Sequence, residues 1–453
     1  MLDWEKLLNQ TRPRDIEKAQ LEMGTATGRT EMERDFDRIL FAAPTRRLAD
    51  KTQVFPLEDN DSVRTRLTHS HEVANLARSI GIRLAFEHSE TIFGADHERL
   101  QVKRNIPACL AAIGLAHDLG NPPFGHQGEL AIRQWYRDEL AGEKDLDFKR
   151  FDGNAQTFRL LTRLQILNDK HGLNLTVGTL ASLLKYPSVY GSETKGGYKK
   201  SGVFASEREI VENVWRHTGL REGQRHPLAY IMEACDDIAY SVVDAEDIVK
   251  KGYASYYDLI EFLRSMGGKD RVLETVVSQT EKKHQEYRTE NLSPRELNDI
   301  SMQMFRVKAM SEMIESTIST FVENINQIMD GSIEPGFELI ESSSSQQLCE
   351  ALQSFNYRMG FTHREVLELE LQGHNYIKGM MDMLWAGVQT QDDEEKPFER
   401  YIFGEISENY RRVFDSTDKS IYHKSQLVAD AVSGMTESYL IRKFNEYQSL
   451  KRD

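Results

Sequence analysis

An adjacent histidine and aspartate, His117 and Asp118, end an apolar segment in the first third of the chain. The preceding residues, IPACLAAIGLA, are apolar enough to be buried, and a histidine and a carboxylate at the end of such a segment are costly to bury uncompensated. A divalent metal ion would compensate both, because neutral imidazole and carboxylate are metal ligands. Two adjacent residues cannot complete a metal site, so other segments must supply further ligands.

Two other segments offer partners for this His-Asp pair. His69 starts an amphipathic stretch in RTRLTHSHEVANLA, and Asp236 belongs to an acidic pair inside the apolar PLAYIMEACDDIAYSVVDAEDI. His71 and Asp237 are the neighbouring alternatives. Residues one or two positions apart on a helix do not share a face, so only one member of each pair can face the metal. Each residue alone is more often structural or solvated, and it is their combination that favours a metal site.

Helical periodicity predicts the elements that must carry these residues. Helices are expected over residues 69–83, 105–116, 160–167, 177–184, 227–250, 271–287 and 293–329. Strand-like patterns are scarce, and only residues 196–204 and 332–340 could form short strands or hairpins. We therefore expect an all-α fold with at most short β-hairpins. We expect a core over residues 1–254 and a helical C-terminal extension over residues 255–453 that packs on the core.

The composition restricts the class of protein. The chain has 453 residues and a formal net charge of −15, which argues against coating nucleic acid or an anionic membrane by bulk charge but leaves room for a local basic groove. Its three cysteines form no metal-binding or disulfide pattern. The first residues lack the apolar stretch of a signal peptide, and no run approaches the roughly 18 apolar residues of a membrane span. We expect a cytoplasmic protein with no membrane partner.

Two further groups of residues have spacings suited to chemistry. His126 and Glu129 are three positions apart in HQGE, so one helical face would let the carboxylate orient the imidazole for acid–base work near neutral pH. On the residues alone, an acidic side chain near a helix start is the simpler interpretation. Asp236, Tyr240 and Asp244 are four positions apart in turn, so one helical stripe would carry a ligand, a phenol and a carboxylate.

The arrangement of His69, His117-Asp118 and Asp236 resembles the H…HD…D pattern of the HD-domain phosphohydrolases. Longer strings are similar to one branch of them, the deoxyguanosinetriphosphate triphosphohydrolases and related dNTPases. These strings occur in the family's order: DKTQVFPLEDNDSVRTRLTHSHEV, HDLGNPPFGHQGE, FDGNAQTFR, LLKYPS, EACDDIAYSVVDAED and VSGMTESYL. HDLGNPPFGHQGE is the most specific of them. The resemblance implies an HD-domain helical core.

The resemblance also implies a reaction. Four ligands, His69, His117, Asp118 and Asp236, would hold one divalent ion, with Mn²⁺ expected and Mg²⁺, Fe²⁺, Ni²⁺ or Zn²⁺ as alternatives. Water would attack the α-phosphorus of a dNTP, preferably dGTP, releasing the deoxynucleoside and inorganic triphosphate.

The resemblance further implies roles for other residues. His126 and Glu129 would be catalytic. Lys185 and Arg66 would meet phosphate, Tyr186 and Tyr240 the sugar, and Asp244 and Gln53 the 3′-hydroxyl. Asn154 is a further substrate candidate. Two features depart from the family: His71 follows His69 by two positions, and the segment between Asn154 and Lys185 is long.

Alternatives stay open at this point. Another HD enzyme, a nucleotide phosphodiesterase or a (p)ppGpp hydrolase, would share the metal ligands but not the HQGE, KYP and DDIAY strings together. A regulatory or single-stranded nucleic-acid-binding HD protein is a second alternative. A P-loop NTPase is disfavoured because GxxxxGK[ST] is missing. The resemblance implies a homo-oligomer, hexamers included, and a contact for single-stranded DNA or an allosteric nucleotide. Arg411 and Arg412 are candidates for that contact, although a solvated helix face is the simpler interpretation.

Overall fold

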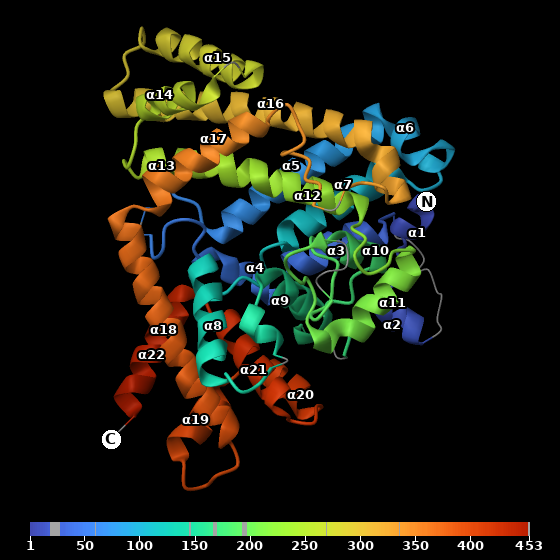
Figure 1. Cartoon of the computed structure of the whole chain (residues 1–453), viewed down its shortest axis with the longest axis vertical. Helices are drawn as coiled ribbons and strands as arrows, with labels where there is room; N and C mark the ends of the chain where they lie inside the picture. Colours follow the sequence, from blue (N-terminus) through green and yellow to red (C-terminus); the bar gives the residue numbers. More distant parts are fainter. Residues whose placement is uncertain are drawn as a thin grey trace.

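The computed structural model describes residues 1–18, 28–58, 60–144, 146–165, 170–192, 197–268, 270–334 and 336–451. Helices dominate these residues (Figure 1). Within the same ranges, β pairing is limited to two isolated bridges, Thr52 with Thr65 and Val189 with Val203. The expected all-α fold is confirmed. One residue of the second bridge, Val203, lies in the strand-like segment 196–204, whereas the described part of residues 332–340 forms turns and irregular structure.

The first half of the chain supplies the elements around the predicted ligands. Its helices are α1 (Trp4–Leu7), α2 (Pro13–Glu17), α3 (Glu31–Leu40), α4 (Ala43–Arg47), α5 (Arg66–Glu87), α6 (Ser89–Phe93), α7 (Val102–Ala116), α8 (Gly125–Glu139), α9 (Gly153–Arg159), α10 (Val177–Ser182), α11 (Arg208–Thr218), α12 (Pro227–Ile238) and α13 (Asp244–Lys250). A π-helical turn, Ala239–Val243, joins α12 to α13.

The second half forms two groups of helices. The helices α14 (Tyr256–Gly267), α15 (Arg271–Tyr287), α16 (Pro294–Asp330) and α17 (Gln346–Asn356) pack together at one end of the molecule. At the other end α18 (Arg364–Gln389) packs against α8 and is joined by α19 (Pro397–Glu405), α20 (Glu408–Asp415), α21 (Ile421–Ser433) and α22 (Glu437–Leu450) (Figure 1).

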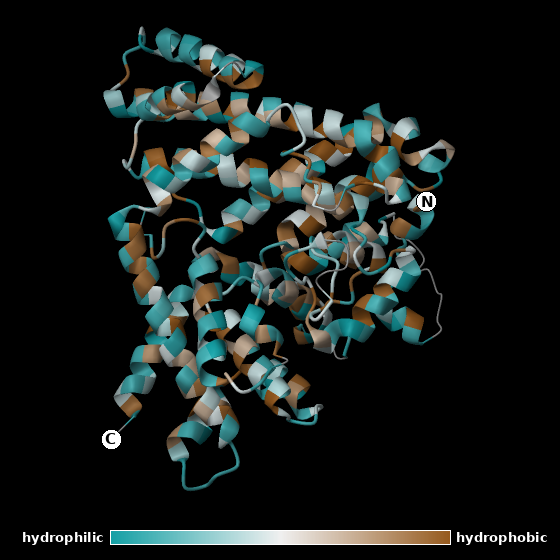
Figure 2. Ribbon diagram, viewed as in Figure 1, coloured by the Kyte–Doolittle hydropathy of each residue, from teal (hydrophilic) through white to brown (hydrophobic). Residues whose placement is uncertain are grey.

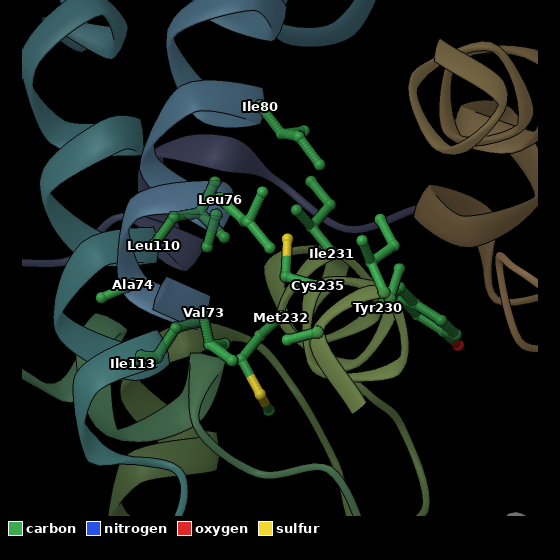
Figure 3. Close-up of a cluster of buried hydrophobic side chains, with 14 of the residues drawn as sticks. Val73, Ala74, Leu76, Ile80, Leu110, Ile113, Tyr230, Ile231, Met232 and Cys235 are labelled. Atoms are coloured by element: carbon green, nitrogen blue, oxygen red, sulfur yellow. The ribbon is translucent and has the colours of Figure 1, made fainter. Parts of the chain in front are cut away.

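Apolar packing fixes three helices around the predicted metal ligands. Figure 3 shows side chains of α5, α7 and α12 converging in one cluster, with Val73 and Ile80 from α5, Ile113 from α7 and Ile231 from α12; all four are buried. A Cβ added to Gly114 of α7 would lie 2.8 Å from the Cα of Ala74 on α5. Such a distance is shorter than van der Waals contact allows, so α5 and α7 approach as closely as they do because position 114 has no side chain.

A second buried cluster joins early and late parts of the chain. It contains Trp135 and Tyr136 of α8 together with Met380 of α18 and Val428 of α21. The first cluster likewise combines α5, α7 and α12 with α16 and α17. Figure 2 shows hydrophilic and hydrophobic residues on the same helices, as amphipathic helices require. The division of the chain at residue 255 stays a prediction. No helix among the described residues is long and apolar enough to span a membrane.

Candidate active site

Three of the four predicted metal ligands come together on three helices. His69 lies in the first turn of α5, His117 directly follows α7 and Asp236 lies near the end of α12. One ligand atom of each lies within 4.8 Å of those of the other two. The Nε2 atoms of His69 and His117 are 3.1 and 3.4 Å from the same Asp236 oxygen, Oδ1. Both histidines are buried.

The orientation of His117 suits a cation. Its Nδ1 donates a hydrogen bond to the carbonyl oxygen of Gly114 at 2.7 Å, so Nε2 is the nitrogen left for a ligand bond. That Nε2 atom is buried and has no hydrogen-bond partner among the described residues. Burial alone would lower the pKa of His117, but the carboxylates of Asp118 and Asp236 outweigh it and raise the pKa to about 9.

Asp236 shows the same preference for positive charge. Burial would raise the pKa of its carboxyl group, but the positive charge of His117 and the close contacts with His117 and His69 hold the pKa well below its usual range. Two imidazoles and a carboxylate of this kind form a donor set for a divalent ion. A metal ion would replace the proton that these groups otherwise share.

Asp118 lies beside the cluster and is held by two other side chains. Its Oδ1 is 3.6 Å from Nε2 of His117 and accepts a hydrogen bond from Asn121 at 2.6 Å. Its Oδ2 forms an ion pair with Arg66 at 2.5 Å. Arg66, expected to meet phosphate, therefore orients a predicted ligand in this structure. A Cβ added to Gly125 would lie 2.5 Å from a guanidinium nitrogen of Arg66, so a side chain at position 125 would clash with Arg66 in this position.

One small cavity is lined both by His117, a predicted metal ligand, and by Asn154 and Lys185, two predicted substrate contacts. Its lining residues are His117, Asn154, Thr157, Phe158, Leu183, Leu184, Lys185 and Gly202. Nζ of Lys185 lies 3.3 Å from Glu233, and this carboxylate outweighs burial to raise the pKa of the ammonium group. Lys185 thus brings its positive charge to a cavity with mixed polar and apolar walls beside the metal cluster. A negatively charged ligand is the expected occupant of such a cavity.

A lysine that the sequence analysis did not single out lies next to Tyr186. The Nζ atoms of Lys185 and Lys200 are both 5.8 Å from the centre of the Tyr186 ring. Lys200 also pairs with Asp152 at 2.9 Å, and Asp152 accepts two hydrogen bonds from Asn154. The signal for Lys200 was weak, because it lies in a loop sequence, GYKKSG, with no family string around it.

Two of the predicted sugar contacts carry buried polar atoms without partners. Neither carboxyl oxygen of Asp244 has a hydrogen-bond partner among the described residues, nor has Oε1 of Gln53. Burial, with Asp247 adding its negative charge, raises the pKa of Asp244 well above its usual range. In its protonated form, Asp244 can donate as well as accept a hydrogen bond. Buried polar groups are usually hydrogen-bonded, so both residues are candidates to bind a polar group of a ligand.

The helix that carries Asp236, Tyr240 and Asp244 contains a π-helical turn. The four-residue spacing assumed an unbroken α-helix, whereas residues Ala239–Val243 form this turn. The amide of Asn356 on α17 donates hydrogen bonds to the carbonyl oxygens of Tyr240 and Ser241 at 3.1 and 2.9 Å. The Tyr240 ring packs on Phe361, with centres 5.6 Å apart.

The two predicted catalytic residues lie side by side at the start of α8. Nδ1 of His126 is 3.6 Å from Oε2 of Glu129. The buried Glu129 accepts hydrogen bonds from the backbone N–H of Gly153 at 2.7 Å and from Arg133 at 2.8 Å. The His126 side chain is 84% exposed and is outside the set of residues that line the cavity. His126 therefore reaches solvent while its neighbour is fixed.

The alternative metal ligands, His71 and Asp237, and the two arginines of the predicted nucleic-acid or nucleotide contact lie outside the metal cluster. His71 is exposed on α5, and Asp237 is half-buried, with burial raising the pKa of its carboxyl well above the usual range. Neither belongs to the three-residue cluster. Arg411 donates to the carbonyl oxygen of Ile406, and Arg412 is exposed.

Comparison with known proteins agrees with the geometry. The HD domain pattern matches residues 66–241, a range that includes all four predicted ligands. A Listeria monocytogenes protein named deoxyguanosinetriphosphate triphosphohydrolase-like protein is 34% identical, over 97% of this chain and 97% of its own. A Synechocystis protein of the same name is 31% identical, over 96% and 97%. A Serratia proteamaculans protein named deoxyguanosinetriphosphate triphosphohydrolase is 30% identical, over 93% of each chain.

Proposed function

This chain belongs to the HD-domain family of deoxyguanosinetriphosphate triphosphohydrolase-like proteins, and from that premise we propose that it hydrolyses dNTPs, with dGTP preferred, to a deoxynucleoside and inorganic triphosphate. The observation that carries the proposal is the cavity shared by His117, Asn154 and Lys185. It joins a cation-binding cluster to the half-buried ammonium group of Lys185, and this combination suits a polyphosphate substrate.

In this proposal His69, His117 and Asp236 hold a divalent ion, with Asp118 beside them as the fourth ligand. When bound, the ion supplies Lewis-acid polarisation at the α-phosphate and compensates negative charge there. Mn²⁺ is the proposed ion, since the cluster combines imidazole with carboxylate. Arg66 holds the Asp118 carboxylate toward the cluster through Oδ2.

The remaining groups act on the substrate directly. Lys185 compensates phosphate charge, and Asn154 contributes an amide at the same cavity. Asp244 and Gln53, whose buried oxygens have no hydrogen-bond partner in the described part of the chain, bind the 3′-hydroxyl. Tyr240 and Tyr186 enclose the sugar. A close fit of this kind would exclude a 2′-hydroxyl and so select deoxyribonucleotides over ribonucleotides.

Product analysis tests the proposal. The purified protein is incubated with Mn²⁺ and each dNTP, with GTP as the matched ribonucleotide. We expect release of free deoxynucleoside together with intact triphosphate, fastest with dGTP and much slower with GTP. Orthophosphate or pyrophosphate as the direct product would contradict the proposal. The proposed cytoplasmic location, homo-oligomer and contact with single-stranded DNA or a second nucleotide need separate measurements.

Replacing His126 with alanine is expected to lower kcat at least about 100-fold while the protein keeps its metal. In the proposed reaction His126 protonates the leaving 5′-oxygen or stabilises the attacking water, with Glu129 fixing its ring. Steady-state kinetics with dGTP and metal analysis of the same sample measure both effects. His71→Ala is the matched control, because His71 is exposed on α5 and outside the cluster. Unchanged turnover in His126→Ala would assign His126 a structural role.

A further inference from the structure

Glu437, the first residue of α22, has an unusual set of partners for a side chain at the start of a helix. Its buried carboxylate accepts three hydrogen bonds from the first third of the chain. Oε1 accepts from the backbone N–H of Thr52 at 2.7 Å and from that of Phe124 at 2.9 Å, and Oε2 accepts from Oγ1 of Thr52 at 2.5 Å. One carboxylate thus joins residues separated by more than 300 positions.

These partners exclude the simplest interpretation of an acidic residue at a helix N-terminus. An acidic side chain there usually interacts with the helix dipole or with free N–H groups of its own helix. In α22 that role belongs to Thr436, whose Oγ1 accepts from the N–H of Tyr439. The Glu437 carboxylate is instead used by N–H groups of two other segments, which would otherwise be buried without partners.

A lysine makes a parallel connection next to the first. The buried Nζ of Lys51 donates to the carbonyl oxygen of Asn121 at 2.6 Å and to that of Ser433 at 2.8 Å. Asn121 in turn donates to Oδ1 of Asp118. Lys51 and Glu437 together connect residues 433–437 to the middle of the turn 118–124, at Asn121, and to its end, at Phe124. We call these five hydrogen bonds the C-terminal clasp.

The clasp holds the backbone beside three residues of the proposed reaction. Gln53 directly follows Thr52, His126 is two residues after Phe124, and Asp118 is the partner of Asn121. The turn itself is strained where Glu437 holds it: Phe124 has a φ of 60° and Gly125 a φ of 51°. A non-glycine residue in the left-handed region is stable only where the surrounding structure holds it.

We propose that Glu437 is a positioning residue that sets the turn 118–124 and Gln53 for catalysis from the far end of the chain. The inference rests on the proposed function for the reaction that it affects. Among the described residues, Glu437 belongs neither to the three-residue metal cluster nor to the cavity lining. Its effect must therefore pass through the backbone of the two segments that it joins.

The test compares Glu437→Ala with Glu437→Gln. The amide oxygen of glutamine can still accept from both N–H groups, and its NH₂ can donate to Oγ1 of Thr52, so Gln is expected to stay within about 3-fold of wild type. Alanine removes all three bonds and is expected to lower kcat/KM for dGTP about 100-fold, because small displacements of reacting groups have effects of that size. Both variants should bind stoichiometric Mn²⁺.

A second readout separates positioning from general damage. With Gln53 displaced, Glu437→Ala should discriminate less between dGTP and 2′,3′-dideoxyguanosine triphosphate than wild type does. Ser438→Ala is the matched control: Ser438 also ties α22 to the N-terminal segment, through Asp50 at 2.9 Å, but leaves the turn untouched. If Glu437→Ala prevents folding, Glu437→Asp replaces it, because aspartate keeps the charge but has a side chain shorter by one methylene. We expect Glu437→Asp to lower kcat/KM for dGTP, but by less than alanine would.

Hydrogen exchange makes the outcome independent of the substrate assignment. Glu437→Ala should speed exchange of the Thr52 and Phe124 amides, and Glu437→Gln should not. Wild-type kinetics and discrimination in a folded, metal-loaded Glu437→Ala protein would overturn the proposal. If wild type releases no triphosphate from any dNTP, the proposed function fails. The positioning role of Glu437 is then tested by Mn²⁺-dependent hydrolysis of bis(p-nitrophenyl) phosphate. Slower hydrolysis by Glu437→Ala, with Glu437→Gln at the wild-type rate, supports this role, and equal rates for all three proteins overturn it.

Discussion

Asp236→Asn is expected to release the metal ion and to lower turnover of dGTP by a factor on the order of 1,000. Asparagine has nearly the same shape, but it lacks the negative charge that both imidazoles face, at 3.1 and 3.4 Å from Oδ1. Even residues that only orient a ligand change metal affinity by about 10- to 100-fold, so loss of a ligand should exceed that range. Metal analysis after gel filtration and steady-state kinetics measure the two effects.

The adjacent carboxyl group provides the control. Asp237→Asn changes the next residue of α12 in the same way, but Asp237 lies outside the three-residue cluster, and burial raises the pKa of its carboxyl well above its usual range. We expect this variant to keep its metal. Stoichiometric metal in Asp236→Asn, or its loss in Asp237→Asn instead, would contradict the assignment. Treatment of wild type with EDTA should reproduce the inactive state, and added Mn²⁺ should reverse it.

Asp430→Ala is expected to lower the free energy of unfolding by about 3–5 kcal/mol. Asp430 of α21 forms two-point contacts with the buried Arg159 of α9, at 2.8 and 2.7 Å, and also accepts from Gln156. Burial would lower the pKa of Arg159, but Asp430 and Glu207 outweigh it, so the guanidinium stays charged. Removing Asp430 leaves that charge buried with Glu207 alone.

Urea unfolding followed by circular dichroism measures this loss. Glu5→Ala is the contrasting variant, because it breaks an ion pair with Arg99 in which both side chains are more than half exposed. Exposed pairs contribute little, so its unfolding midpoint should not move measurably. An Asp430→Ala protein as stable as wild type would mean that the Arg159 charge finds another partner or water.

The helices were predictable where one face of the chain is apolar. The expected helix over residues 271–287 coincides with α15, and the one over residues 105–116 lies within α7. The expected helix over residues 227–250 is interrupted, because the carbonyl groups freed by the π-helical turn are satisfied by Asn356, more than 100 positions away. Local periodicity contains no information about such a partner. The expected helix over residues 160–167 extends beyond the described residues.

Some contacts of the candidate site were likewise predictable from the sequence, and others were not. The residue types predicted that a histidine near position 69 and an aspartate near position 236 meet His117, and the family resemblance selected His69 and Asp236 over His71 and Asp237. The pairing of Arg66 with Asp118 was not predictable, because phosphate and carboxylate attract a guanidinium equally well. Glu437 was part of a family string, TESY, but its spacing to Thr52 and Phe124 exists only in the folded chain.

The contact between Gly114 and Ala74 influences the size of the ion that the two histidines can bind. It limits how closely the helices that bear the two imidazoles approach each other. The distance between the two imidazole nitrogens therefore depends on the packing of the main chains at this contact. An ion of another radius would therefore require substitutions at positions 74 and 114, while the histidines themselves could stay unchanged. Metal preference among relatives should then follow side-chain size at these two positions, which bind no metal.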